Sequence, residues 1–431
     1  MKNIELSAIE PFEIASIRPP TENYSLSFRV TRNCYWNKCK YCPVYKTGNR
    51  FSKRSLEEVK ADVSNAKQID DLLHENGIGI PDYSEADYYR VSSLIDKIKQ
   101  AKNLPEKTEI NNTINDDNDD MDERMKWFMS WFKDKPVLED SIYHIISWRI
   151  SGGKTCFLGD ADSLILKPDF LHDTMTHIKN NFPSLERFTI YGRTRTAAQV
   201  RSLNELKEFH NAGLHRVHFG LESGSDNVLS LINKGVTAAQ HIEGCLKVKD
   251  AGLSCSIYIM PGLGGSKFSQ DNAFETAKVI NAIEPDFVRL RTLEIFPSTP
   301  LEAMRKDGAF IEASEEEVVR ELKILIENIN CNTEILSDSA SNLLDIYGSL
   351  PSDKYYMLRI IDSYLLLPPR EKLEFSLNSR LRSFMGQYGS LSEDIYFKLS
   401  PYIINGALNT EKMSDADMTS TIRLIRSKLM P

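Results

Sequence analysis

The stretch YSLSFRVTRNCYWNKCKYC, residues 24–42, combines the two patterns that decide the fold. Its first part, Tyr24–Thr31, alternates polar and apolar side chains and predicts a β-strand. Its second part places Cys34, Cys39 and Cys42 on the loop that follows, with the spacing C-x4-C-x2-C. The chain thus opens with a strand that leads directly into a cluster of three thiols.

A regular alternation of strands and helices follows this stretch. A capping box at Ser55–Glu58 starts a helix after the cysteine loop. Five further short strands are expected, at residues 154–159, 187–191, 215–221, 254–260 and 286–293. Strands that alternate with helices predict a parallel sheet with right-handed crossovers. Active residues of such folds lie at the carboxyl ends of the strands, where the cysteine loop is expected.

Composition limits the environment and the partners of the chain. It has 431 residues, 41% of them hydrophobic and 26% charged, with a net charge of −8. These values are typical of an ordinary globular protein, and the negative charge makes a nucleic-acid partner unlikely. No apolar run is long enough for a membrane span, and the start lacks the pattern of a secretory signal. We therefore expect a cytoplasmic protein with reduced thiols.

Three clustered thiols leave several chemical interpretations open. A disulfide is disfavoured in a reducing compartment, and three is an odd number. A structural zinc site needs four ligands, usually in two pairs, and no second pair or nearby histidine is present. Iron–sulfur clusters bind thiolates, usually four, so three would leave one iron open for chemistry. The remaining cysteines are scattered and are expected to be small buried side chains: Cys156, Cys245, Cys255 and Cys331.

The cysteine loop and the motif HFGLESGSD, residues 218–226, together resemble the radical S-adenosylmethionine (SAM) superfamily. The core is similar to oxygen-independent coproporphyrinogen oxidases and tRNA methylthiotransferases, and the chain resembles an uncharacterised branch. The resemblance covers about residues 24–300 and implies a partial (β/α)6 TIM-like barrel. It implies a [4Fe-4S] cluster on Cys34, Cys39 and Cys42, with SAM as the ligand of the fourth iron. The commonest spacing in that superfamily is C-x3-C-x2-C, and this chain has one residue more in the first gap.

The resemblance also assigns roles around SAM. Gly159 and Asp160 stand where a Gly-Gly-Glu motif takes the SAM amino group, although Asp160 alone would also suit a helix cap. Arg193 stands at a position that contacts the ribose or carboxylate, with a solvated surface arginine as the alternative. Tyr41 would shield the cluster or face the adenine, unless it only packs within its loop. Gly262, in MPGLGG, would flank the adenine.

Alternation along two strands adds three charged candidates. His218, Gly220 and Glu222 share one face of their strand, and we expect Glu222 to point inward and accept from the ribose hydroxyls. Arg289 and Arg291 also share one face. Buried guanidinium groups need partners, so these two would bind the SAM carboxylate or an anionic substrate, or pair with internal acids. His218 is expected to be either a core group or a substrate contact.

The expected domain organisation has three parts. Residues 1–23 form an N-terminal extension, residues 24–300 the barrel, and residues 301–431 a mostly helical C-terminal domain. An insertion over about residues 81–150 follows the first unit. Within it, the acidic stretch at about 104–122 predicts a mobile loop. The aromatic stretch WFMSWF, residues 127–132, predicts a partly buried helix or a lid over an apolar substrate.

The function that this resemblance implies is SAM cleavage to a 5′-deoxyadenosyl radical, which abstracts hydrogen from an unidentified small organic substrate. Arg289 and Arg291 would suit an anionic one. Such an enzyme needs an external one-electron donor such as flavodoxin or ferredoxin. Two alternatives stay open: a tRNA-modifying enzyme of the same superfamily, and a non-catalytic iron–sulfur or haem carrier on the same fold.

Overall fold

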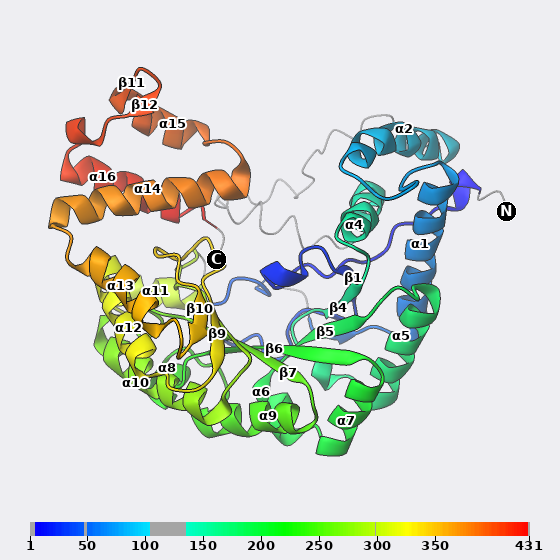
Figure 1. Ribbon diagram of the computed structural model, residues 1–431, viewed down its shortest axis with the longest axis horizontal. Coiled ribbons are helices and arrows are strands. Elements are labelled where there is room, and N and C mark those ends of the chain that lie inside the picture. The colour runs from blue at the N-terminus through cyan, green and yellow to red at the C-terminus, as the bar shows by residue number, and fades with distance from the viewer. Residues whose placement is uncertain (1–4, 47–49, 104–134, 298, 430–431) are drawn as a thin grey trace.

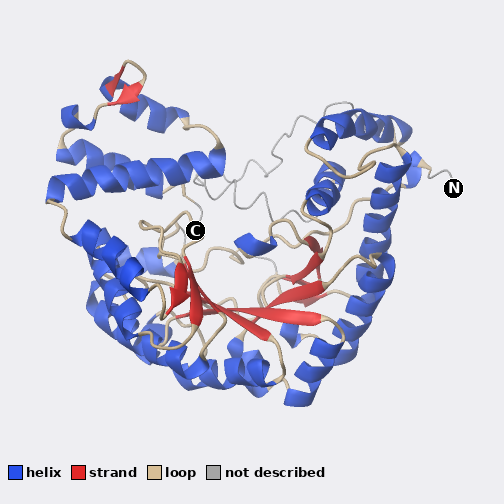
Figure 2. Cartoon of the chain, in the orientation of Figure 1, coloured by secondary structure: helices blue, strands red, loops and turns tan. Residues whose placement is uncertain are grey.

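The protein is described here by a computed structural model covering residues 5–46, 50–103, 135–297 and 299–429. The acidic stretch at 104–122 and the aromatic stretch at 127–132 lie outside the described residues. One mixed sheet forms the centre of the molecule, with an arc of helices on its outer side (Figures 1 and 2). Its eight strands lie in the order β1-β4-β5-β6-β7-β8-β9-β10.

Six of the eight strands of the sheet, β1 and β4 to β8, fall where the alternation predicts them. The eight strands are β1 (Leu26–Arg29), β4 (Thr155–Gly159), β5 (Arg187–Gly192), β6 (Leu214–Glu222), β7 (Ser254–Ile259), β8 (Phe287–Leu290), β9 (Thr333–Leu336) and β10 (Gly348–Leu350). All neighbouring pairs from β1 to β9 are parallel, and β10 alone runs antiparallel to β9. The prediction of a parallel α/β sheet with six strand units is confirmed, and the strand order is that of an open, partial barrel.

Helices connect the strands and cover the outer face of the sheet. The barrel helices are α1 (Leu56–Glu75), α5 (Pro168–Asn181), α6 (Thr194–Gln199), α7 (Leu203–Asn211), α8 (Asp226–Leu231), α9 (Ala238–Asp250), α10 (Gly265–Ile283), α11 (Pro300–Lys306), α12 (Glu315–Asn328) and α13 (Lys354–Leu365). Ser55 and Glu58 form the predicted capping box at the start of α1. Inside the insertion, α2 (Ala86–Ala101) and α4 (Leu138–Ile150) pack beside α1.

The helical C-terminal unit begins later than the sequence suggested. Strands β9 and β10 extend the sheet, and α12 and α13 share the large hydrophobic core of the barrel. A separate core joins α14 (Pro369–Tyr388), α15 (Glu393–Leu399) and α16 (Asp415–Arg426). The structure therefore places the start of this unit near Pro369 instead of Leu301. Two strands of three and four residues carry too little periodicity to be found in the sequence.

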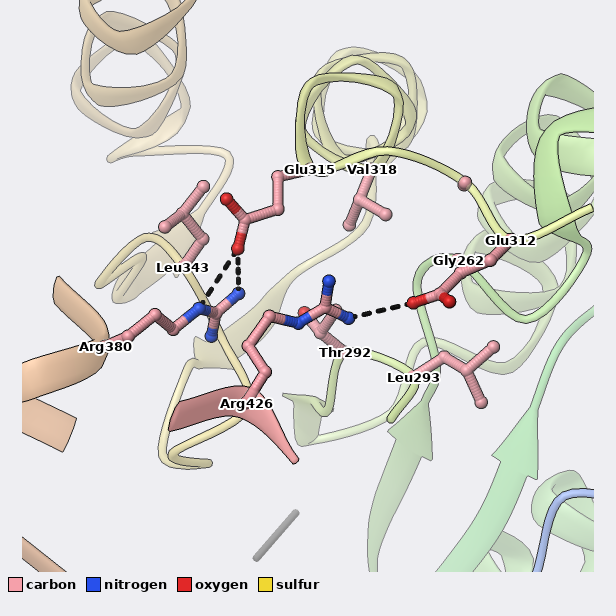
Figure 3. Close-up of a pocket in the computed structure, with 10 residues that line it drawn as sticks. Gly262, Thr292, Leu293, Glu312, Glu315, Val318, Leu343, Arg380 and Arg426 are labelled. Carbon is pink, nitrogen blue, oxygen red and sulfur yellow. Dashed lines mark hydrogen bonds and ion pairs between the residues drawn. The ribbon is translucent and has the colours of Figure 1, made fainter. Parts of the chain in front are cut away.

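Buried ion pairs hold the C-terminal helices against the barrel (Figure 3). Arg380 of α14 donates to Glu315 of α12 at 2.8 Å, beside a small cavity of about 20 Å³. Arg426 of α16 donates from Nη2 to Glu312 at 3.1 Å and from Nε to Glu294 at 3.0 Å. Because Glu294 follows β8, these pairs connect the last helix to the carboxyl ends of the strands.

Two pairs of two-residue strands lie outside the main sheet. Strand β2 (Thr31–Arg32) pairs with β3 (Ser52–Lys53) around the cysteine loop, and β11 (Ile403–Ile404) pairs with β12 (Ala407–Leu408) in the C-terminal unit. Among the helices of the described chain, none combines the length and the apolar character that crossing a membrane requires.

Candidate functional site

A cavity of about 760 Å³ lies at the carboxyl ends of the strands. Its wall is built by the cysteine loop, the ends of β5, β6, β7 and β8, the N-terminal segment before β1, and α4. Its polar lining includes Arg18, Cys34, Cys39, Tyr41, Cys42, His144, Tyr191, Arg193, Glu222, Lys234, Tyr258, Arg291 and Glu294. The volume lies within the range of small-molecule sites. The structure thus brings the three clustered thiols and several charged groups to one place.

The cysteine loop is fixed by the segment that follows α8. The indole Nε1 of Trp36 donates to the carbonyl oxygen of Asn233 at 2.9 Å. The backbone N–H of Lys40 donates to the carbonyl of Ile232 at 2.9 Å. Gly235 adopts a φ of +71°, and a Cβ atom at this position would lie 2.1 Å from the Trp36 ring. The glycine therefore allows the loop to pack closely on the barrel.

All three thiols line the cavity and are partly exposed to it. Burial raises the pKa of Cys39, against the opposing charges of Lys234 and Arg193. Burial and the neighbouring Cys39 raise the pKa of Cys42 to about 12. In the described parts of the chain, no group of three His, Cys, Asp or Glu side chains is placed to hold a single metal ion. The thiolates of an iron–sulfur cluster bind separate irons, so they do not have to converge on one point as the ligands of a single ion do.

Glu222 ends β6 and points into the cavity, in agreement with the predicted alternation. Its φ is +70°, and the register with β7 shifts between Gly220 and Glu222. A non-glycine residue in this conformation is strained and is usually held by its surroundings. Here the holding contact is Lys234, whose Nζ lies 2.9 Å from Oε1 of Glu222. Burial lowers the pKa of Lys234, but the charges of Glu222 and Cys39 outweigh burial and raise it.

Arg193 connects the cysteine loop to the end of β5. Its guanidinium lies over the rings of Tyr35 and Trp36, at 5.3 and 5.1 Å from their centroids. Its Nη2 donates to the carbonyl of Lys234 at 2.6 Å, while its buried Nη1 has no hydrogen-bond partner. The predicted position of Arg193 at this site agrees with the structure, and one donor remains for a ligand.

Arg291 and Tyr258 form a second group of donors in the cavity. The Arg291 guanidinium lies 5.4 Å from the centroid of the Tyr258 ring. The Nε of Arg291 is buried without a hydrogen-bond partner, whereas the hydroxyl of Tyr258 interacts with Tyr191. Arg291 forms no ion pair with an acid in the described part of the chain. A buried donor without a partner is costly, so Arg291 is suited to a bound polar ligand.

Four predicted contact residues lie outside the lining of the cavity. Asp160, fully buried, accepts from Nε of Arg29 at 2.7 Å, and Gly159 packs against Ala15. Arg289 is also fully buried, and its donors reach Asp338, Ser256 and Thr21. The amide of Gly262 donates to Glu321 at 3.1 Å. These residues meet partners from distant parts of the sequence, which local patterns do not reveal.

His218 has its own partner below the cavity. Its Nε2 lies 3.6 Å from Oε1 of Glu22, and both side chains are fully buried. Burial lowers the pKa of His218 to about 4, against the effect of Glu22. Of the two roles that the sequence left open for His218, its position favours the core role.

Sequence reasoning missed Lys234, Trp36, Arg18 and His144. Lys234 follows α8 in a segment without a recognisable motif. Arg18 precedes the first predicted strand, and His144 lies on a helix of the insertion. A lone lysine, tryptophan, arginine or histidine gives no periodic signal, so only the folded chain shows that these side chains share one cavity.

Comparison with known families gives one family match. Residues 127–276 match the model of the Radical SAM superfamily. The matched range includes β4 to β7 and Glu222, and it begins after the three cysteines. The family match therefore does not bear on the cysteine loop. Its role as cluster ligand rests on the spacing of the three cysteines and on their place in the cavity.

Two curated relatives share part of the sequence. The tRNA uridine(34) acetyltransferase of Methanocaldococcus infernus is 29% identical over 119 residues, or 27% of this chain. The enzyme of the same name from Methanocaldococcus jannaschii is 28% identical over 116 residues. The match spans about a fifth of the length of these relatives, 22% and 21%.

Solved structures with a similar chain course have low sequence identity. Methanocaldococcus infernus Elp3 with an N-terminal deletion is 19% identical, with a TM-score of 0.37 over 49% of this chain and 53% of that chain. The cobalamin-dependent SAM radical enzyme OxsB, with aqua-cobalamin and SAM bound, is 13% identical and has a TM-score of 0.38. The alignment covers 93% of this chain and 50% of OxsB. HydG, a maturase of the [FeFe]-hydrogenase, is 11% identical and has a TM-score of 0.38. The alignment covers 93% of this chain and 79% of HydG.

Proposed function

We propose that this protein, a radical SAM enzyme by its family domain, binds its cluster and SAM in the 760 Å³ cavity and acts on an anionic organic substrate. Radical SAM enzymes use a [4Fe-4S] cluster together with SAM. The observation that carries the proposal is that Cys34, Cys39 and Cys42 line the same cavity as Glu222 and Arg193. The thiols come from one loop and the charged groups from two strand ends.

The residues of the cavity fit these cofactors. Three thiolates supply three cluster ligands and leave a fourth position for SAM. Unpartnered buried donors on Arg193 and Arg291 fit a polar ligand that carries a carboxylate and hydroxyl groups. Held by these residues, the cluster and SAM would supply one-electron reductive cleavage of a carbon–sulfur bond, with the electron from an external donor, and hydrogen-atom abstraction from the substrate.

The chain supplies orientation and charge around that chemistry. Lys234 forms an ion pair with Glu222 and orients its carboxylate to accept hydrogen bonds from the SAM ribose. Arg193 holds Trp36 and Tyr35 of the cysteine loop and offers Nη1 to the SAM carboxylate. Tyr41 contributes an aromatic wall beside Cys42, and burial together with the charge of Glu222 raises the pKa of its hydroxyl. Tyr41 therefore stays a neutral donor at pH 7.

The decisive experiment is release of 5′-deoxyadenosine from SAM by the reconstituted, anaerobically reduced protein. Glu222→Gln should keep its iron and bind SAM about ten- to a hundredfold more weakly, because a charged hydrogen-bond partner is lost. The matched control is Glu243→Gln, on the exposed face of α9, which should bind SAM as the unmodified protein does. Iron retention without any 5′-deoxyadenosine would favour the non-catalytic carrier instead.

A tRNA substrate is the second candidate, and the two curated relatives named tRNA uridine(34) acetyltransferase favour it. The net charge of −8 disfavours it, because RNA binding usually needs a basic surface. Transfer of deuterium from labelled tRNA into 5′-deoxyadenosine would establish the tRNA function. Transfer only from small carboxylated or phosphorylated compounds would exclude it. The assay also identifies the one-electron donor, by comparing reduced flavodoxin and ferredoxin.

A further inference from the structure

Arg18 lines the cavity from the N-terminal segment without an acidic partner. The segment is held against β1, where the backbone N–H of Arg29 donates to the carbonyl of Glu13 at 3.1 Å. Within the described chain, Arg18 forms no ion pair. Its only polar contact with another described side chain is with His144. Burial lowers the pKa of Arg18 to about 10, so the guanidinium is charged at pH 7. A half-buried cation without an anion indicates a site for one.

His144 presents a second donor to the same point. The backbone N–H of Ser27 donates to Nε2 of His144 at 2.9 Å, so Nε2 is an acceptor and carries no proton. Burial and the charge of Arg18 lower the pKa of His144 well below its usual value, so the ring is neutral. Its single proton is therefore on Nδ1, which lies 3.3 Å from Nη1 of Arg18. Two donors that meet at this distance need an acceptor beside them, within reach of both.

This pair lies apart from the groups that surround the thiols. The cationic side chains that act on Cys39 are Lys234 and Arg193, whereas Arg18 acts on His144 and Tyr191. Tyr191 is also within the electrostatic influence of Arg291. Arg18 and His144 come from the N-terminal segment and α4, which are not barrel strands. The donors of this part of the wall are thus additional to those assigned to SAM.

We propose that the Arg18 guanidinium and the Nδ1–H of His144 bind an anionic oxygen group of the substrate, a carboxylate or a phosphate. The inference rests on the proposed function, since it places the substrate in the cavity that holds the three cysteines. Arginine presents two parallel N–H donors to either anion, and the imidazole N–H adds a third from a fixed direction. This site would bind the negatively charged end of the substrate. The rest of the cavity would then orient the carbon that reacts.

The test measures anion binding to the full-length reconstituted protein, with acetate and inorganic phosphate as probes. Affinities come from line broadening of the acetate proton and phosphate phosphorus signals. One or both anions should bind, and Arg18→Gln should weaken binding by at least about tenfold, because a charged partner is lost. Arg18→Lys keeps the charge and should retain part of the binding. Arg359→Gln, an exposed arginine of α13, is the matched control and should bind as the unmodified protein does.

The outcomes separate this site from the proposed function. Binding of acetate alone indicates a carboxylated substrate, and binding of phosphate alone a phosphorylated one. Failure of both anions to bind, or equal binding in Arg18→Gln, would overturn the site. A tenfold loss of SAM affinity in Arg18→Gln would also overturn it, because the anion would then be the SAM carboxylate. Release of 5′-deoxyadenosine, measured on the same samples, tests the proposed function independently of anion binding.

Discussion

Lys234 donates from Nζ to Oε1 of Glu222 across 2.9 Å, and this pair stands beside Cys39 in the cavity wall. Both side chains are about 10% exposed, at 11% and 10%. Glu222 ends β6 with a positive φ, and Lys234 follows α8 in the segment that also anchors the cysteine loop. This ion pair therefore connects the end of β6, where Glu222 has its positive φ, to the segment that holds the cysteine loop.

Removal of Lys234 should destabilise the protein. Lys234→Met leaves the Glu222 carboxylate nearly buried without its partner, which we expect to cost about 3 kcal/mol of unfolding free energy. Urea denaturation measures this cost. The double variant Glu222→Gln/Lys234→Met removes both charges and should recover most of the loss. A double variant as unstable as the single one would show that Lys234 acts by packing and not by charge.

Replacement of Cys34, Cys39 and Cys42 with Ala should abolish iron–sulfur absorbance and SAM cleavage together. The reason is that each thiolate binds a different iron of the cluster. Iron analysis and visible absorbance of the reconstituted protein are the measurements. Cys331→Ala, a buried cysteine far along the chain and outside the cavity, should retain the cluster. About four irons retained in the triple variant would contradict the ligand assignment.

Arg289 and Arg291 should respond to substitution in opposite ways. Arg289→Leu leaves Asp338 without its ion-pair partner, so we expect a loss of about 3 kcal/mol in unfolding free energy. Arg291→Leu removes no ion pair within the described chain and should unfold at nearly the same urea concentration. It should instead weaken SAM binding or lower the ratio of substrate radical to 5′-deoxyadenosine. Equal stability of the two variants would contradict the distinction that the contacts draw.

Glu321 should make stability depend on pH. This side chain is 3% exposed, and burial raises its pKa to about 7, against hydrogen bonds from Ser269, Gly262 and Asn272. The folded protein therefore keeps a proton that the unfolded chain releases above its ordinary pKa of about 4.3. Because the folded state binds more protons in this window, its stability falls as pH rises from about 4.3 to 7, by about 3 kcal/mol.

Urea denaturation at several pH values tests the effect of Glu321. Glu321→Gln cannot titrate, so the decrease between about pH 4.3 and pH 7 should shrink by about 3 kcal/mol in this variant. Glu317→Gln, which removes the capping-box carboxylate of the same helix, serves as a control for general changes in α12. A decrease of the same size in Glu321→Gln would assign the pH dependence to other groups.

The sequence by itself determined the parallel α/β sheet, the strand that delivers the cysteine loop, and the inward direction of Glu222. These features follow from local properties: alternation along a strand, a capping box, and the spacing of three cysteines. Arg193, Tyr41 and Arg291 also reached the cavity as expected, because they stand at or next to the ends of predicted elements.

Only the tertiary structure decided which charges pair and which remain for a ligand. Asp160 meets Arg29, 131 residues away, and Arg289 meets Asp338, so both charges have partners within the protein. Arg18 meets His144 across 126 residues and forms no ion pair with any described residue. A buried charge must find a partner, and that partner comes from whichever distant element packs against it. No local pattern records that choice, because it depends on how the complete chain closes around the cavity.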